Sequence, residues 1–220
     1  MSQIHPDFRQ RRHSRIPAAR GLYDFANEHD ACGVGLVANL DNVPSHEIVR
    51  MGETVLERLM HRGAAGGDPD TGDGAGLLLG IPDEFFRQAV DFALPDPGRY
   101  GVAMVFGSPE YDAMLESFVR AEGATVLGCR PVPTDPAAIG RLARESCPEI
   151  RQIFVAAAAE WDRDAFERKL FVIRRQVEKA VSAEEYYFCS FSSRSIVYKG
   201  LLLAPQLGRF YPDLRSSDFK

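Results

Sequence analysis

Cys32 is the residue whose surroundings best suit nucleophilic chemistry. It follows a polar leader and opens the glycine-bearing apolar run of residues 32–39 (CGVGLVAN). If the leader were removed, Cys32 would carry a thiol and a free α-amino group. That amine has an ordinary pKa of about 7.7–8.0, so it can accept the thiol proton and pass it to a leaving group. The alternative is that Cys32 is a small buried residue of a strand.

A glycine-rich loop, residues 62–76 (RGAAGGDPDTGDGAG), is the second candidate for chemistry. Bare backbone amides can bind phosphate, but a P-loop requires a lysine and this loop has none. The dinucleotide-binding pattern places its glycines between a strand and a helix, whereas these follow a helix and precede a strand. Nucleotide binding is therefore disfavoured. The structural alternative is a tight loop that needs positive φ at several positions.

Composition narrows the class of protein. The 220 residues carry 26 Lys and Arg against 31 Asp and Glu, a formal charge of −5, which disfavours nucleic acid and anionic membranes as partners. No apolar run approaches the roughly 20 residues that cross a bilayer. The four cysteines form no CxxC pair, which disfavours a metal site, and they indicate reduced thiols in a cytoplasmic protein. We expect Cys129, Cys147 and Cys189 to be core or strand residues.

Residues 1–31 differ from the rest of the chain. Five arginines make residues 1–20 basic, with almost no apolar periodicity, and acidic residues follow. The segment lacks the apolar centre of a secretory signal. It is either a frayed terminus or a removable leader, and composition does not choose between them.

The remaining chain alternates strands and helices. Ser45 can cap a helix that runs to about His61, and an acidic residue at 162 or 164 can cap a second helix that ends at Lys179. The second helix carries an apolar stripe of Phe166, Leu170, Ile173 and Val177. Further helices are predicted at residues 83–90, 109–121 and 137–145, strands at 32–39, 77–81, 100–106, 124–127 and 152–158, a loop at 129–136, and a hairpin-like pair of strands at 186–192 and 195–198. This pattern predicts one α/β or α+β domain.

Several blocks of the sequence resemble a known family. Residues 28–35 (EHDACGVG) look like the processing junction of the glutamate synthase large subunit. Residues 59–64 (LMHRGA) and 70–76 (DTGDGAG) match that family's next two blocks in order and spacing. Residues 186–200 and 207–214 are similar to a third region. The resemblance covers most of the chain from Gly21 to Leu214.

The resemblance implies a class II glutamine amidotransferase domain. Its expected fold is α+β, a four-layer αββα sandwich of the N-terminal-nucleophile type, here incomplete. Residues 1–31 would be the leader, cut between Ala31 and Cys32, and residues 32–220 the domain. Cys32 would attack the carboxamide of L-glutamine and form a γ-glutamyl thioester that water hydrolyses. Arg62 would order the site around the thiol; its structural alternative is a cation that satisfies the end of the preceding helix, and the two are compatible. Gly63 and Asp73 are the expected substrate-binding residues.

The resemblance also implies partners. In the family, ammonia travels to a synthase centre that aminates 2-oxoglutarate with FMN and an iron–sulfur cluster. We expect those cofactors on partner subunits and none in this chain. The family's domain continues with HSRFSTNT-like and HNGE-like segments that supply substrate contacts and the oxyanion hole, so we expect other glutamate-synthase-like chains to supply them. The alternative is a non-catalytic or regulatory remnant that binds a partner without hydrolysing glutamine.

Overall fold

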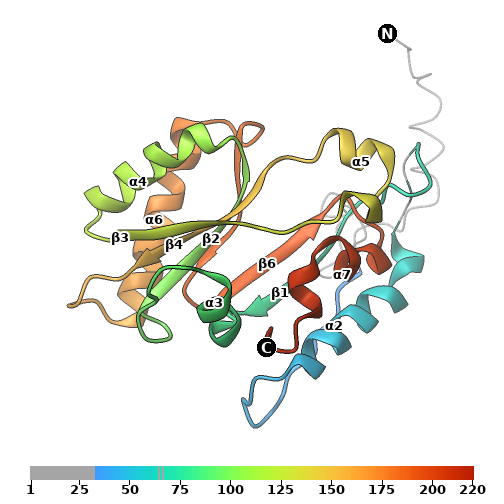
Figure 1. Ribbon diagram of the computed structural model, residues 1–220, viewed down its shortest axis with the longest axis horizontal. Helices are drawn as coiled ribbons and strands as arrows, with labels where there is room; N and C mark the ends of the chain where they lie inside the picture. Colours follow the sequence, from blue (N-terminus) through green and yellow to red (C-terminus); the bar gives the residue numbers. More distant parts are fainter. Residues whose placement is uncertain (1–32, 64, 66) are drawn as a thin grey trace, which may run out of the picture. The chain divides into compact units, whose positions relative to one another are not determined.

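The structure is a computed structural model that describes residues 33–63, 65 and 67–220 of the chain. Helices and strands intermix along the sequence, as predicted (Figure 1). The helices are α2 (His46–Arg58), α3 (Asp83–Ala89), α4 (Asp112–Ala121), α5 (Arg141–Glu145), α6 (Arg163–Ala180) and α7 (Leu207–Phe210). The strands are β1 (Ala75–Gly80), β2 (Tyr100–Gly107), β3 (Thr125–Pro131), β4 (Ile150–Ala156), β5 (Tyr186–Ser192) and β6 (Ser195–Gly200).

Four strands form an antiparallel sheet in the order β3-β4-β2-β5. Strand β2 lies between β4 and β5, with Val102 opposite Phe154 on one side and Ser192 on the other. Its side chains are apolar at successive positions, so both faces of the strand can be buried. Ala103 and Val105 point to one core, and Val102 and Met104 point to the other.

Helices α4 and α6 cover one face of this sheet, and α6 confirms the sequence prediction closely. Asp162 caps the helix by accepting a hydrogen bond from the Ala165 amide at 2.6 Å. The predicted stripe is fully buried, and it packs on Ala103, Val105, Ile153 and Val155 of the sheet. The four stripe residues are Phe166, Leu170, Ile173 and Val177.

The second core lies on the opposite face and joins segments that are far apart in sequence. Phe86 of α3 meets Phe154 of β4 edge-on, with ring centroids 5.0 Å apart. Tyr198 of β6 meets Tyr211, after α7, in the same way and also at 5.0 Å. Leu77 of β1 lies opposite Tyr198 in a two-stranded antiparallel sheet, β1-β6, that contributes to this core.

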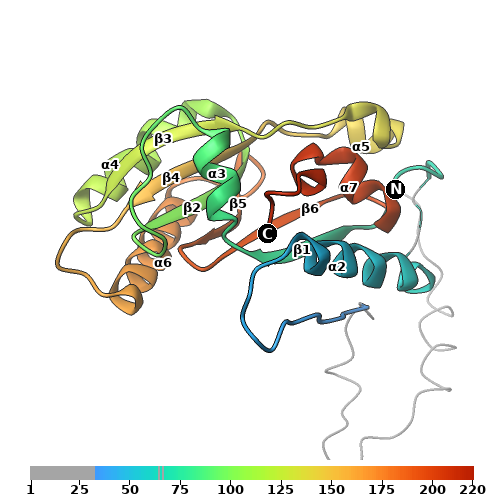
Figure 2. The ribbon, with the colours of Figure 1, turned by 60° about the horizontal axis from the view of Figure 1, so that its bottom comes forward.

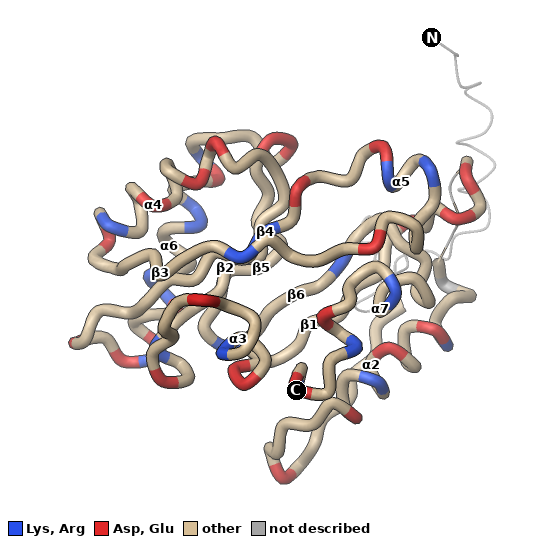
Figure 3. Tube along the Cα trace, viewed as in Figure 1, with Lys and Arg blue, Asp and Glu red and all other residues tan. Residues whose placement is uncertain are grey.

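The class of fold is the predicted one. Two antiparallel sheets lie on the inside, and helices cover them (Figure 2), as expected for an α+β fold of the N-terminal-nucleophile type. Charges of both signs are interspersed along α2, α4 and α6 (Figure 3), in keeping with the modest net charge.

The predicted strand at residues 32–39 is the main error within the described chain, because residues 33–39 form no strand. Val34, Leu36 and Leu40 are 87, 91 and 99% exposed. A strand requires a neighbour for its backbone N–H and C=O groups, and no described strand pairs with this segment. The segment and the turn that follows it thus leave three large apolar side chains, at residues 34, 36 and 40, exposed to solvent.

The predicted hairpin is also wrong. Strands β5 and β6 are joined at Ser193 and Arg194, but β5 pairs with β2 while β6 pairs with β1. Side chains on β5 bind the β6 backbone in place of a ladder: the Ser190 hydroxyl accepts a hydrogen bond from the Val197 amide at 3.1 Å. The Glu167 carboxylate of α6 accepts bonds from the Ser193 amide and hydroxyl, which holds the turn. The chain therefore changes sheets at this turn.

Three smaller differences concern ends of elements. Strand β3 runs to Pro131, into the predicted loop, because an edge strand tolerates a proline. The helix predicted at 137–145 is divided into a 3₁₀ turn, Pro136–Ala138, and α5, because Gly140 between them is extended. Ser45 occupies the N-cap position of α2, but its side chain makes no capping hydrogen bond.

A buried polar network links both sheets to the C-terminal segment. Asp213, which is 4% exposed, accepts two hydrogen bonds from Arg130 of β3, each at 2.8 Å. It also accepts one from the Tyr198 hydroxyl at 2.9 Å. Burial raises the pKa of Tyr198 well above its ordinary value, so the phenol keeps its proton and donates it. Gln152 of β4 completes the network by accepting from Arg130 and donating to Tyr198.

We predict that Asp213→Ala destabilises the fold by about 3–5 kcal/mol, because it leaves the buried Arg130 cation without its carboxylate. The matched control is Glu116→Ala, which breaks the exposed Arg120–Glu116 pair and should cost at most about 1 kcal/mol. Urea unfolding followed by circular dichroism measures both. An equal loss of unfolding free energy in the two variants would contradict the conclusion that the buried network stabilises the fold more than an exposed ion pair.

Candidate functional site

The predicted nucleophile and processing site, Cys32 and Ala31, lie outside the described residues. The described chain begins at Gly33, directly after the thiol-bearing residue. Its second glycine, Gly35, packs so closely on Val55 of α2 that a β-carbon there would clash with the valine side chain. This contact brings the segment that leads to Cys32 against the helix that leads to Arg62.

Arg62 ends the 3₁₀ turn Met60–Arg62, which follows α2. The amide of Gly63 donates to the carbonyl of Met60 at 3.0 Å and closes that turn. The side chain of Arg62 is not described, so its predicted role beside the thiol stays a prediction. Its backbone position, one turn beyond the end of α2, leaves the structural alternative open as well.

The structure brings together the two predicted substrate-binding residues, Gly63 and Asp73. A β-carbon at Gly63 would lie 3.3 Å from Oδ1 of Asp73. The next residue, Gly74, has φ of +135°, a conformation that L side chains rarely adopt, and it turns the chain into β1. The glycine-rich loop thus closes on itself, with residue 63 beside residue 73 and an isolated bridge between Ala65 and Gly72.

Asp68 organises this loop, a role that the sequence analysis missed. Its carboxylate accepts hydrogen bonds from the Asp70 amide at 3.1 Å, the Thr71 hydroxyl at 3.0 Å and the Leu142 amide at 3.2 Å. The bond from the Asp70 amide is the largest cause that lowers the pKa of Asp68. An aspartate two residues before its amide partner is a common turn signal, which the sequence DPDT contains.

Further contacts tie the loop to the C-terminal half of the chain. The Asp70 carbonyl accepts bonds from the Gly140 amide at 2.9 Å and the Gln206 side chain at 2.8 Å. Gly72 lies against the backbone of Leu202, with no room for a β-carbon. The loop is therefore held by its own Asp68 carboxylate and by contacts to distant segments. Of its described glycines only Gly74 has a positive φ, so close packing, as at Gly72, accounts for the loop better than positive φ at several positions.

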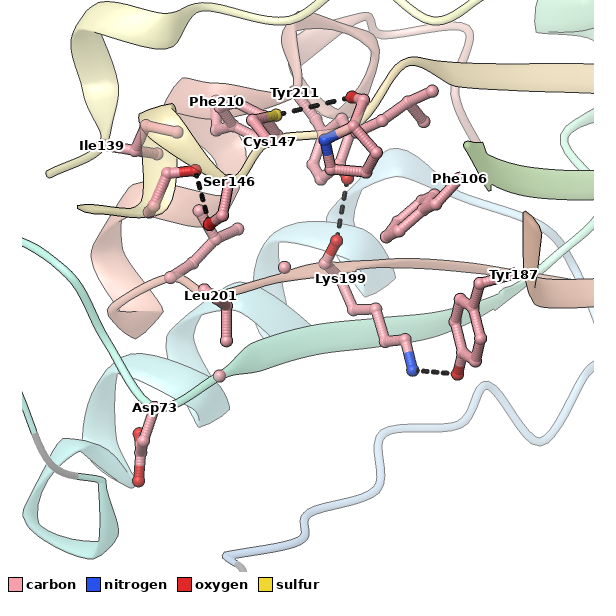
Figure 4. Close-up of a pocket in the computed structure, with 16 residues that line it drawn as sticks. Asp73, Phe106, Ile139, Ser146, Cys147, Tyr187, Lys199, Leu201, Phe210 and Tyr211 are labelled. Atoms are coloured by element: carbon pink, nitrogen blue, oxygen red, sulfur yellow. Dashed lines mark hydrogen bonds between the residues drawn. The ribbon is translucent and has the colours of Figure 1, made fainter. Parts of the chain in front are cut away.

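A cavity of about 330 Å³ opens beside this loop (Figure 4). That volume lies at the lower end of the range of small-molecule sites. Apolar side chains form most of its wall, and the polar residues are few. The lining residues are Asp73, Gly74, Phe106, Ile139, Ala143, Ser146, Cys147, Pro148, Ile150, Tyr187, Lys199, Gly200, Leu201, Leu202, Phe210 and Tyr211.

Two residues of the cavity, Lys199 and Tyr187, were not predicted as site residues. The Lys199 ammonium donates a hydrogen bond to the Tyr187 hydroxyl at 2.5 Å (Figure 4). The ammonium also lies 4.6 Å from the centre of the tyrosine ring. No pattern in the sequence could pair them, since they come from strands of two different sheets.

The three described cysteines have thiol pKa values above the ordinary value. All three are free thiols: Cys129 and Cys147 are exposed and Cys189 is half-buried on β5. Cys129 and Cys189 lie on strands as expected, whereas Cys147 lies just after α5, outside any helix or strand, which corrects that part of the prediction. Burial of the sulfur is the largest cause that raises each pKa, to about 11 for Cys189. Thiolates, the reactive form, are therefore disfavoured at these three positions.

None of the described helices is long and apolar enough to cross a bilayer. The described His, Cys, Asp and Glu side chains contain no group of three that could hold a metal ion.

Comparison with known proteins identifies the class to which this fold and loop belong. The family described as "Glutamine amidotransferases class-II" matches residues 32–220, which is most of the chain and begins at Cys32. The chain therefore belongs to the class II glutamine amidotransferases, as the sequence motifs indicated.

Individual relatives narrow the class. The chain is 46% identical over 217 residues to the "Glutamate synthase [NADPH] large chain" of Bacillus subtilis (strain 168), covering 94% of this chain and 14% of that protein. It is 42% identical over 214 residues to "Ferredoxin-dependent glutamate synthase 1, chloroplastic/mitochondrial" of Arabidopsis thaliana, covering 91% and 13%. The "Glutamate synthase [NADH]" of Saccharomyces cerevisiae (strain ATCC 204508 / S288c) is 36% identical, with 93% and 10% covered. The chain thus spans only a small fraction of these relatives' length.

We predict that Gly72→Ala loosens the loop from Leu202 and destabilises the fold by about 1–3 kcal/mol, because the new methyl group overlaps the Leu202 backbone. Gly67→Ala in the same loop is the matched control, since no heavy atom lies within 4 Å of its added β-carbon. Thermal unfolding measures the difference. A control that loses as much stability as Gly72→Ala would reject the fixed-loop interpretation.

Proposed function

We propose that this chain is the glutaminase module of a glutamate-synthase-like system. The observation that carries the proposal is the family match over residues 32–220, which starts at the residue that sequence chemistry selects as the nucleophile. The raised thiol pKa of Cys129, Cys147 and Cys189 supports the choice of Cys32 over the other cysteines.

The chemistry begins with removal of residues 1–31, which frees the α-amino group of Cys32. The amine takes the thiol proton, and the sulfur attacks the carboxamide carbon of L-glutamine. Collapse of the tetrahedral intermediate breaks the C–N bond, and the amine returns the proton to the departing ammonia. Water then hydrolyses the γ-glutamyl thioester, releasing glutamate and restoring the thiol. The amine acts as the only acid and base in this sequence of steps.

The loop residues have positioning roles in this proposal. A guanidinium at Arg62 would favour the thiolate and offer planar donors to the substrate. Gly63 lies close to Asp73, so the Gly63 backbone and the Asp73 carboxylate are neighbours in this loop. The anchoring of the loop through Asp68 and Asp70 would hold these groups still, which is the condition for aimed attack.

Ammonia must then reach an acceptor, so the proposal includes a partner. We infer that glutamate-synthase-like chains supply the rest of the site and carry the synthase centre with its FMN and iron–sulfur cluster. The exposed stripe of Val34, Leu36 and Leu40 supports this, since its period of two suits pairing with a strand of another polypeptide segment. The free thiols agree with a cytoplasmic location, which we also propose.

One observation favours a second candidate function. Residues 33–39 directly follow Cys32, where the sequence predicts a strand that fixes its position, but they form no strand. A nucleophile on an unpaired segment is poorly aimed. A non-catalytic module that binds a partner without hydrolysing glutamine is therefore the alternative.

We predict that a glutamine-like electrophile, 6-diazo-5-oxo-norleucine, labels the processed chain once, at Cys32. Cys32→Ala should lose the label and glutaminase activity, while Cys129→Ala keeps both. Peptide mass mapping and ammonia release measure the two effects, with and without a co-expressed glutamate synthase polypeptide. Equal labelling of Cys32→Ala and the unchanged chain would reject the catalytic proposal and leave the partner-binding alternative.

Processing itself is a separate prediction. The intact mass of the chain purified after co-expression should correspond to a polypeptide that begins at Cys32, and Cys32→Ala should retain residues 1–31 if the thiol assists cleavage. A mass that always includes Met1 or Ser2 would contradict leader removal and therefore the free α-amino base.

A further inference from the structure

The cavity beside the loop contains hydrogen-bond donors that have no acceptor. An ammonium has three N–H donors, and Lys199 uses one of them on the Tyr187 hydroxyl. That hydroxyl accepts, so its own proton remains available to a third group. The described lysines that form ion pairs are Lys169 with Glu122 and Lys220 with Glu84, and Lys199 is not among them. At least two donors at this end of the cavity are thus unused by the described residues.

The charge at this end is positive and only partly hydrated. Lys199 is half-buried, and its aliphatic part forms cavity wall together with Phe106 and Leu201 (Figure 4). A half-buried cation without a carboxylate loses solvation that an anion could restore. Asp73, the acidic residue of the cavity wall, lies apart from the Lys199 ammonium in Figure 4.

The other walls of the cavity are apolar and indicate the character of the part of the ligand that lies away from Lys199. Side chains of Ile139, Ala143, Ile150 and Phe210 bring apolar surface to the same space. An uncharged hydrocarbon body fits such walls, whereas an α-ammonium group beside Lys199 would meet a like charge. This combination disfavours an α-ammonium group at the Lys199 end of the cavity.

We propose that this cavity is a second ligand site, which binds a small monocarboxylate with an apolar body through Lys199 and Tyr187. The carboxylate accepts from the Lys199 ammonium and the Tyr187 hydroxyl, and the body lies against the apolar wall. Gly74 and Leu202 line the same cavity, and Leu202 contacts Gly72, so an occupied site would stiffen the loop that holds Asp73. The proposal does not depend on Cys32, although the far end of the cavity includes Asp73, which the glutaminase proposal also uses.

The test uses 4-methylpentanoate as the probe, measured by isothermal titration on the full chain. We expect binding with Kd below about 1 mM and binding by 4-methylpentanamide, which lacks the charge, that is about ten- to hundredfold weaker. Lys199→Met should reduce affinity for the carboxylate by the same factor, and Lys199→Arg should restore most of it. Tyr187→Phe should weaken binding less, because only one neutral donor is lost.

Matched controls separate the site from general effects. Lys220→Met removes an equally charged lysine whose partner is Glu84, and Tyr111→Phe removes a hydroxyl bound to Glu185, so neither should change affinity. Circular dichroism confirms that each variant is folded. The proposal is overturned if the amide binds as tightly as the carboxylate, if Lys199→Met binds unchanged, or if no binding is detected. Displacement of the probe by equimolar L-glutamine would also overturn it, because the cavity would then be part of the substrate site.

Discussion

The rest of the structure depends on the hydrogen bonds that the buried Asp213 carboxylate accepts from Arg130 and Tyr198. Through Arg130 it holds an edge strand of the larger sheet, and through Tyr198 it holds the smaller sheet. Its own segment follows α7, whose Phe210 closes the cavity beside the loop. Every polar group in this network has a partner, which is the condition under which buried charge specifies one arrangement.

The loop of residues 62–76 shows how that arrangement reaches the candidate site. Its sequence suggests flexibility, yet Asp68 bonds three groups of the chain and Asp70 bonds two more. The partners at Gly140 and Gln206 come from the C-terminal half, which the Asp213 network fixes. The position of Asp73 beside Gly63 is therefore a consequence of long-range packing.

The exposed side chains of Val34, Leu36 and Leu40 differ from the loop in this respect. No described strand pairs with their segment, and no described residue buries them. These apolar side chains are exposed, while α2 contacts the same segment at Gly35. Apolar side chains that are exposed together, rather than singly, are typical of interaction sites. Pairing with a partner strand would place these side chains on one face of a sheet, where a further layer could cover them.

The sequence by itself determined the helices with a strong apolar period, such as α6 with its Asp162 cap, since those signals are local. Its motifs also identified the family, because several blocks agree in order. It misassigned residues 33–39 and the β5–β6 pair, because strand pairing depends on which distant neighbour is available. Only the tertiary structure decided that β5 and β6 enter different sheets, that Lys199 meets Tyr187, and that Asp68 anchors the loop. The physical reason is that these contacts join residues through packing across the chain, and such contacts leave no periodic signal in the sequence.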